Sequence, residues 1–311
     1  MNLDLKKNKE IHLKSLSQWG RLGWILFLCV TFCFGGCASS SKIRIGVSVN
    51  GYDQLIGWMI RELATRQGIE CQICEVSPGI LNLQPALESN SLQIGIEFSQ
   101  TAWKSVLHEP KAYHASDLTR LQQEYKQRNL YWYPLPMVND HDSLAITKAI
   151  ALKYDLKTMS DLAQISDQLT LGASTQYFEE EDGYPLISSL YGLNFAKTIN
   201  LSDSNLVSSL LEGKVDAVPS HFLDGQFQKA ELILLDADLG VHEDLIAGIV
   251  ITKQAIMKYP TFIEISQSLG RVLQSSQMTI YLKNIALGNA TPQEAALQFL
   301  KAKNLIYEKQ R

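Results

Sequence analysis

The chain has few of the features that mark common enzyme classes. Its 311 residues contain no Gly-x-Ser-x-Gly elbow, no glycine-rich phosphate-binding loop, and no His-x-x-x-His or Glu-x-x-His spacing. Sequence repeats, low-complexity tracts and an internal hydrophobic run long enough to span a membrane are also missing. These absences argue against a serine hydrolase, a nucleotide-binding enzyme or a zinc enzyme, and we expect no metal and no cofactor.

Cysteine is scarce, and its distribution argues against a disulfide framework. Three of the five cysteines lie within the first 37 residues. The other two, Cys71 and Cys74, stand in the segment Gly68 to Val76, which has the composition of a strand. Residues three apart on an extended strand face opposite sides with Cα atoms about 10 Å apart, too far for a disulfide. A redox Cys-x-x-Cys normally begins a helix, so we expect ordinary strand cysteines.

The chain has one uncharged apolar stretch, Leu22 to Phe34, and it follows a basic segment that ends at Arg21. The stretch is short for a bilayer span and suits the hydrophobic region of a signal peptide. It ends in Phe34-Gly35-Gly36-Cys37, similar to a lipobox, although phenylalanine stands where leucine is usual. We therefore expect residues 1–37 to be a lipoprotein signal peptide with Cys37 as the lipid attachment site. The alternative is an uncleaved N-terminal anchor helix. Either way, the body of the protein would be extracytoplasmic (periplasmic or cell surface) and held at a membrane.

The charge balance argues against nucleic acid as a partner. The formal net charge is −4, and this value includes the basic N-terminal segment, so the remainder is more acidic still. The remaining residues, about 270, suffice for two lobes with separate cores.

Apolar strands and amphipathic helices alternate beyond residue 42, which predicts an α/β fold. The alternation is interrupted by the extended segment Tyr131 to Pro136 and then restarts. After Thr252 the chain is helical to its end, with a capping box expected at Thr291 and Glu294. This organisation predicts a first lobe of residues 42–135 plus 253–306 and a second lobe of residues 136–252.

One set of sequence segments, with its spacings, is hard to obtain by chance. Asp182-Gly183-Tyr184-Pro185 follows the strand end Leu171-Gly172-Ala173, and three further segments lie at matching distances: Glu97 to Trp103, Asn139 to Ala145, and Asp224 to Gln226. Together they resemble the substrate-binding lipoproteins of ABC importers for osmoprotectants such as glycine betaine, choline and carnitine. The resemblance implies a two-lobed periplasmic-binding-protein fold (type II) with a ligand cleft between the lobes. It also implies a non-enzymatic role, with an ABC permease and ATPase complex as partner.

In that family, aromatic side chains box a quaternary ammonium group, and a Lys and an Arg hold the carboxylate of betaine. This chain departs from the pattern at several of those positions. Thr101 is retained; the departures are Ser48 at the expected Lys, Phe98 for a Tyr, Asp142 for a cage Tyr, Glu180 for the Arg, and His221 for an aromatic residue.

Acids therefore stand where rings or cations are expected, which favours a cationic or polar solute without a carboxylate. The predicted ligand contacts are Asp140, Asp142 and Glu180 alongside Phe98 and Phe178, with Thr101 and His221. In the simpler interpretation, Glu179 to Glu181 is a solvated turn and Asp142 caps a strand end. Two other functions stay open: a receptor that feeds a sensor, and a cleft enzyme that uses Asp140 and Asp142 as an acid/base pair.

Overall fold

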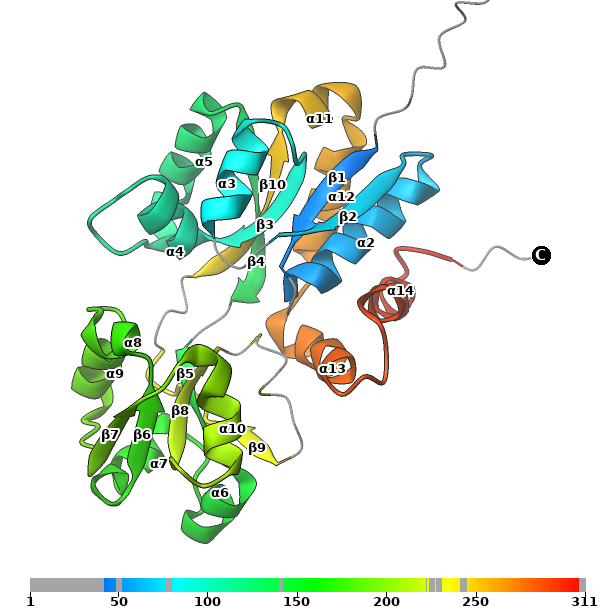
Figure 1. Ribbon diagram of the computed structural model, residues 1–311. Helices are drawn as coiled ribbons and strands as arrows, with labels where there is room; N and C mark the ends of the chain where they lie inside the picture. Colours follow the sequence, from blue (N-terminus) through cyan, green and yellow to red (C-terminus); the bar gives the residue numbers. More distant parts are fainter. Residues whose placement is uncertain are drawn as a thin grey trace, which may run out of the picture. The chain divides into compact units, whose positions relative to one another are not determined.

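The computed structural model describes residues 42–48, 52–76, 80–139, 142–221, 223, 227, 231–240 and 245–307. All of them belong to one compact unit, Lys42–Arg311. Within the described residues, no helix is long and apolar enough to cross a bilayer. The fold contains two five-stranded sheets (Figure 1).

The first sheet has the strand order β2-β1-β3-β10-β4. Strands β1, β2 and β3 are parallel, and β10 runs antiparallel to both of its neighbours, β3 and β4. The strand bounds are β1 (Ile43–Val47), β2 (Cys71–Glu75), β3 (Ile94–Phe98), β4 (Leu130–Asn139) and β10 (Ile246–Thr252).

Two apolar clusters cover the faces of this sheet. The larger cluster is formed with α2 (Tyr52–Arg66), α11 (Lys253–Lys258), α12 (Thr261–Val272), α13 (Ser275–Ala286) and α14 (Pro292–Ala302). The smaller cluster is formed with α3 (Ile80–Glu88), the π-helix η1 (Ala102–Val106) and α5 (Leu118–Gln127); the short helices α4 (Ser99–Thr101) and η2 (Ala115–Asp117) lie between them in sequence. Helices α12 and α13 therefore pack against β4, and α14 packs against α2, so the C-terminal helices belong to the first half of the fold.

The second sheet has the strand order β7-β6-β8-β5-β9. Its strands are β5 (Asp142–Thr147), β6 (Thr170–Ala173), β7 (Lys197–Asn200), β8 (Ala217–His221) and β9 (Leu232–Leu234). Apolar residues on its two faces pack with α6 (Lys148–Tyr154), α7 (Met159–Ala163), α8 (Thr175–Glu179), α9 (Tyr184–Tyr191) and α10 (Leu206–Leu211). The short helices η3 (Ser166–Gln168) and η4 (Asp203–Asn205) complete this half of the chain.

One strand lies in a different half from the predicted one. Residues 136–252 are predicted to form the second lobe, but β10 pairs with β3 and β4 as an interior strand of the first sheet. Its residues from Ala247 to Thr252 are buried, since helices cover both faces of the sheet. The strands of the second sheet come only from residues 142–234.

Two local predictions are confirmed. Cys71 and Cys74 are free thiols on the strand β2. Thr291 and Glu294 form the expected capping box at the start of α14: the Thr291 side chain accepts from the Glu294 N–H, and the Glu294 carboxylate accepts from the Thr291 N–H.

The strand order of the first sheet sets the position of a crevice. From β1 the chain passes through α2 to β2 on one side, and β3 lies on the other side of β1. Strands β1 and β3 share the single register pair Ile45 and Ile94, so their carboxyl ends are not paired with each other. Open α/β sheets bind ligands at such a switch point, outside the carboxyl ends of the strands.

Candidate functional site

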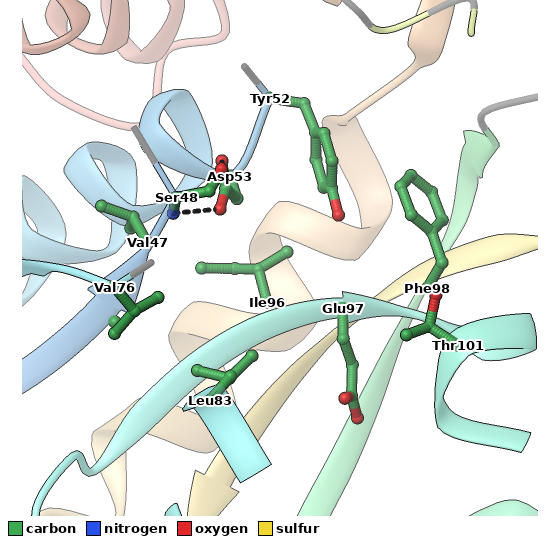
Figure 2. Close-up of a pocket in the computed structure, with 11 residues that line it drawn as sticks. Val47, Ser48, Tyr52, Asp53, Val76, Leu83, Ile96, Glu97, Phe98 and Thr101 are labelled. Carbon is green, nitrogen blue, oxygen red and sulfur yellow. Dashed lines mark hydrogen bonds between the residues drawn. The ribbon is translucent and has the colours of Figure 1, made fainter. Parts of the chain in front are cut away.

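A pocket of about 160 Å³ lies at the carboxyl ends of β1 and β3 (Figure 2). Its lining includes Val47, Ser48, Tyr52, Asp53, Phe98 and Thr101. The end of β1 supplies Val47 and Ser48, the start of α2 supplies Tyr52 and Asp53, and Phe98 and Thr101 flank the turn from β3 into α4. The pocket therefore occupies the position that the sheet topology favours for a ligand.

Two aromatic rings face each other in this pocket. The ring centroids of Tyr52 and Phe98 are 4.7 Å apart, and the ring planes are inclined at 47° (Figure 2). Both side chains are half-buried. The structure thus brings together Phe98 and Thr101, both predicted from the sequence, with Tyr52, which was not among the predicted contacts. The sequence signal for Tyr52 is its place directly after Asn50-Gly51, and the structure has it as the first residue of α2.

Ser48, which stands at the expected lysine position, is hydrogen-bonded to Asp53. The Ser48 backbone N–H donates to Oδ2 of Asp53 at 2.5 Å, and its hydroxyl donates to Oδ1 at 2.8 Å. The Gln54 N–H donates to the same carboxylate at 2.9 Å. Burial raises the pKa of Asp53, and these hydrogen bonds oppose the increase. The described residues that line the pocket include no Lys and no Arg, so they offer no cation for a ligand carboxylate.

Two of the predicted ligand contacts, Phe178 and Glu180, lie in the second half of the chain, outside the pocket of Tyr52 and Phe98. The Phe178 ring is half-buried and packs edge-on against Tyr184, with centroids 5.7 Å apart. The Glu180 carboxylate is exposed and accepts from Nε2 of Gln176, one turn earlier, at 2.6 Å. Neither residue lines the pocket of Tyr52 and Phe98. The exposure of Glu180 fits the solvated-turn interpretation of the acidic run.

The Asp182-Gly183 turn is linked to the segment that carries the pocket. Gln100 Nε2 donates to Oδ2 of Asp182 at 3.1 Å, while Oε1 of Gln100 accepts from the Tyr113 N–H at 2.9 Å. The turn needs glycine at position 183, because a Cβ there would lie 2.3 Å from the carbonyl oxygen of Tyr177. The motif is visible in the sequence, but Asp182 and Gln100 are not among the predicted ligand contacts.

The remaining predicted contacts are described in part or not at all. The main chains of Asp142 and His221 are directly opposite each other on the antiparallel strands β5 and β8. The side chains of Asp142 and His221 are not described. Asp140 and Cys37 also lie outside the described residues. The register therefore brings two predicted positions together at one end of the second sheet.

The fold and this site define a solute-binding protein with two α/β halves. Residues 41–302 match the family described as the substrate-binding domain of an ABC-type glycine betaine transport system, and the chain belongs to this family. The mixed α/β fold predicted from the sequence is confirmed, because its structural neighbours are two-lobed substrate-binding proteins.

Individual proteins show how far the similarity extends. The ergothioneine transport permease/ergothioneine binding protein EgtU of Helicobacter pylori is 30% identical over 227 residues, which cover 73% of this chain and 41% of that protein. This chain thus spans less than half the length of that relative. The glycine-betaine-binding protein of Pseudomonas aeruginosa is 23% identical over 290 residues, covering 89% of this chain and 93% of that protein.

Solved structures agree on the fold. A glycine betaine/carnitine/choline ABC transporter structure has a TM-score of 0.73 at 21% identity, covering 85% of this chain and 99% of that one. The apo structure of YehZ from Escherichia coli has a TM-score of 0.65 at 18% identity, covering 86% of this chain and all of that one (100%).

Proposed function

We propose that this chain is the extracytoplasmic solute-binding component of an ABC importer, and that it delivers a small solute with a quaternary ammonium or other cationic group to the permease. The observation that carries the proposal is the Tyr52–Phe98 ring pair at the switch point of the first sheet, in a chain of the ABC substrate-binding family. The role is binding and release, without turnover of the solute.

The pocket chemistry supports a cationic head group. A trimethylammonium group has no N–H to donate, so the electron-rich faces of aromatic rings are its best desolvated partners. Tyr52 and Phe98 supply such faces, and Thr101 supplies a hydroxyl nearby. Asp53 adds a buried carboxyl to the same lining. These residues suit choline or the trimethylammonium end of carnitine and ergothioneine better than a free carboxylate.

We expect choline, which has no carboxylate, to stabilise the full chain in a thermal-shift screen, and glycine betaine to bind weakly or not at all. The reason is the missing carboxylate clamp, since Ser48 is bonded to Asp53 and Glu180 stands at the expected Arg. A ligand at about 100 times its Kd adds roughly 2.7 kcal/mol to the free energy of unfolding, which such a screen detects. Calorimetry would then rank the solutes. Glycine betaine binding as tightly as choline would contradict the proposed selectivity, and no binding by any quaternary ammonium solute would contradict the proposed function.

We further propose that the protein is a lipoprotein anchored through Cys37, as the apolar run and the two glycines before this residue suggest. A diacylated cysteine provides the two-chain anchoring that a single acyl chain cannot. Cys37→Ser should leave unprocessed precursor and abolish incorporation of radiolabelled fatty acid. Cys33→Ser is the matched control and should be labelled like the parent. Equal labelling of Cys37→Ser and the parent would rule out this anchor.

A further inference from the structure

Glu97 is among the residues that line the pocket, and it carries a buried carboxylate. Glu97 is the penultimate residue of β3, between Ile96 and Phe98. Its side chain extends from the face of the strand opposite to the one that carries the Ile96 and Phe98 side chains (Figure 2). The residue is only 3% exposed, and neither carboxylate oxygen accepts a hydrogen bond from the described residues. Buried carboxylates are normally paired or hydrogen-bonded, so this group requires an explanation.

Two side-chain donors lie beside this carboxylate. The Tyr125 hydroxyl comes from α5 and the Trp132 Nε1–H from β4, and both favour the charged form of the Glu97 carboxylate. Both donor atoms are buried, and neither reaches hydrogen-bond geometry with a described partner. Two donors and one carboxylate thus converge from three elements in the interior of the first half of the fold.

The backbone leaves space for this arrangement. Gly248 of β10 is the register partner of Glu97 on β3. A Cβ at Gly248 would lie 2.2 Å from ring atoms Cε2 and Cζ2 of Trp132. The indole therefore lies against the bare backbone of Gly248, and any larger residue would displace it from its place near Glu97.

No cation neutralises Glu97 within the described part of the chain. The helices packed on this face contribute mainly apolar side chains, among them Leu83 and Leu87 of α3 and Leu121 of α5. Besides Glu97, the charged groups that affect the pKa of Tyr125 are Arg128 and Glu88, and these two form an ion pair with each other at 3.2 Å. A bare carboxylate in such surroundings loses its hydration without gaining a counter-charge.

We propose that Glu97, Tyr125 and Trp132 form an internal proton-binding site, in which the Glu97 carboxyl holds a proton at acidic pH, releases it around neutral pH, and so sets the charge beside the ligand pocket. Bound, the proton makes Glu97 neutral. Released, it leaves a negative charge on the reverse side of the strand that carries Phe98.

The direction of the pKa supports this site. Burial raises the pKa of Glu97 from 4.5 to about 7, and Tyr125 and Trp132, which favour the anion, only partly oppose the increase. Because the folded state binds this proton more tightly than the unfolded chain, the contribution of Glu97 to stability is fully present below pH 4.5 and is lost as the pH rises to about 7. The folding equilibrium constant should fall by about two orders of magnitude across that window because of this group alone.

The test is a carbon-13 NMR titration of the Glu side-chain carboxyl groups in the full chain, without ligand, with Glu97→Gln used to assign the resonance. We expect the Glu97 carboxyl to titrate near pH 7. Tyr125→Phe removes a donor that favours the anion, so it should move the midpoint to higher pH; a purely structural role of Tyr125 would leave the midpoint unchanged. If Glu97→Gln fails to fold, the Tyr125→Phe shift provides the assignment. A midpoint in the ordinary range of exposed glutamates, or a midpoint that Tyr125→Phe does not move, would overturn the proposal.

Thermal unfolding provides a second, independent test of the proton-binding site. Glu97→Gln mimics the neutral acid, so it should raise the Tm relative to the parent at pH 8 and leave it nearly unchanged at pH 4.5. Glu88→Gln is the matched control, because the Glu88 side chain is 40% exposed and its variant should follow the parent at both pH values. Equal effects of Glu97→Gln at both pH values would also overturn the proposal.

Discussion

Gly248→Ala is expected to lower the free energy of unfolding by about 3 kcal/mol, within the range seen for overpacked cores. The added Cβ would lie 2.2 Å from two ring atoms of Trp132, on an interior strand of the first sheet, where Gly248 pairs with Glu97 and Pro134 on either side. A protein of this size should lose roughly 6–12 °C in Tm. Thermal unfolding followed by circular dichroism would measure the loss.

A compensating variant tests whether the indole is the cause. Trp132→Phe removes part of the ring that the new methyl group would meet, so the double variant Gly248→Ala/Trp132→Phe should be destabilised by less than the sum of the two single changes. Strict additivity would show that the methyl group acts on something other than Trp132. An unchanged Tm in Gly248→Ala would show that the close packing at this strand position is absent in solution.

Phe98→Ala is expected to weaken choline binding by roughly tenfold or more, because one of the two ring faces in the pocket is removed and a cation–π contact in a desolvated site is worth about 1–2 kcal/mol. Phe98→Tyr keeps the ring and should bind almost like the parent. Tyr52→Ala should produce a loss comparable to that of Phe98→Ala, since the two rings form one pair. Calorimetry at constant pH gives the dissociation constants.

Asp142 provides the second half of this test. If its carboxylate acts with Phe98 on one cationic group, Asp142→Asn should weaken binding with little change in Tm, and the Phe98→Ala/Asp142→Asn double variant should lose less than the sum of the two effects. Unchanged affinity in Asp142→Asn would make this acid a bystander. The site would then be rebuilt on the aromatic residues that the structure does describe.

Part of the site was predictable from local sequence. Phe98 and Thr101 are predicted from their family positions at the end of an apolar strand, and both line one pocket; their contact with a solute stays a prediction. The capping box at Thr291 and the strand cysteines were predictable for the same reason, because neighbouring residues fix them. Glu180 is predicted only from its place at a family Arg, and the local sequence does not reveal its exposure or its hydrogen bond with Gln176.

The position of β10 shows a limit of sequence analysis. The run Ile246–Thr252 is apolar on both faces, so it suits the centre of either sheet. Its place is decided by pairing with β3 and with β4, which lie more than a hundred residues earlier in the chain. Periodicity indicates that a strand is buried, but it does not name the strand's neighbours.

The sequence by itself determined the alternation of strands and helices, the family frame around Asp182, and the absence of catalytic motifs, because each depends on residues close together in the chain. Only the tertiary structure decided that Tyr52 faces Phe98, and that Glu97, Tyr125 and Trp132 meet beside the pocket. The physical reason is that a side chain's face follows from its local backbone, whereas its partner depends on strand order and register, which long-range hydrogen bonds and core packing fix together.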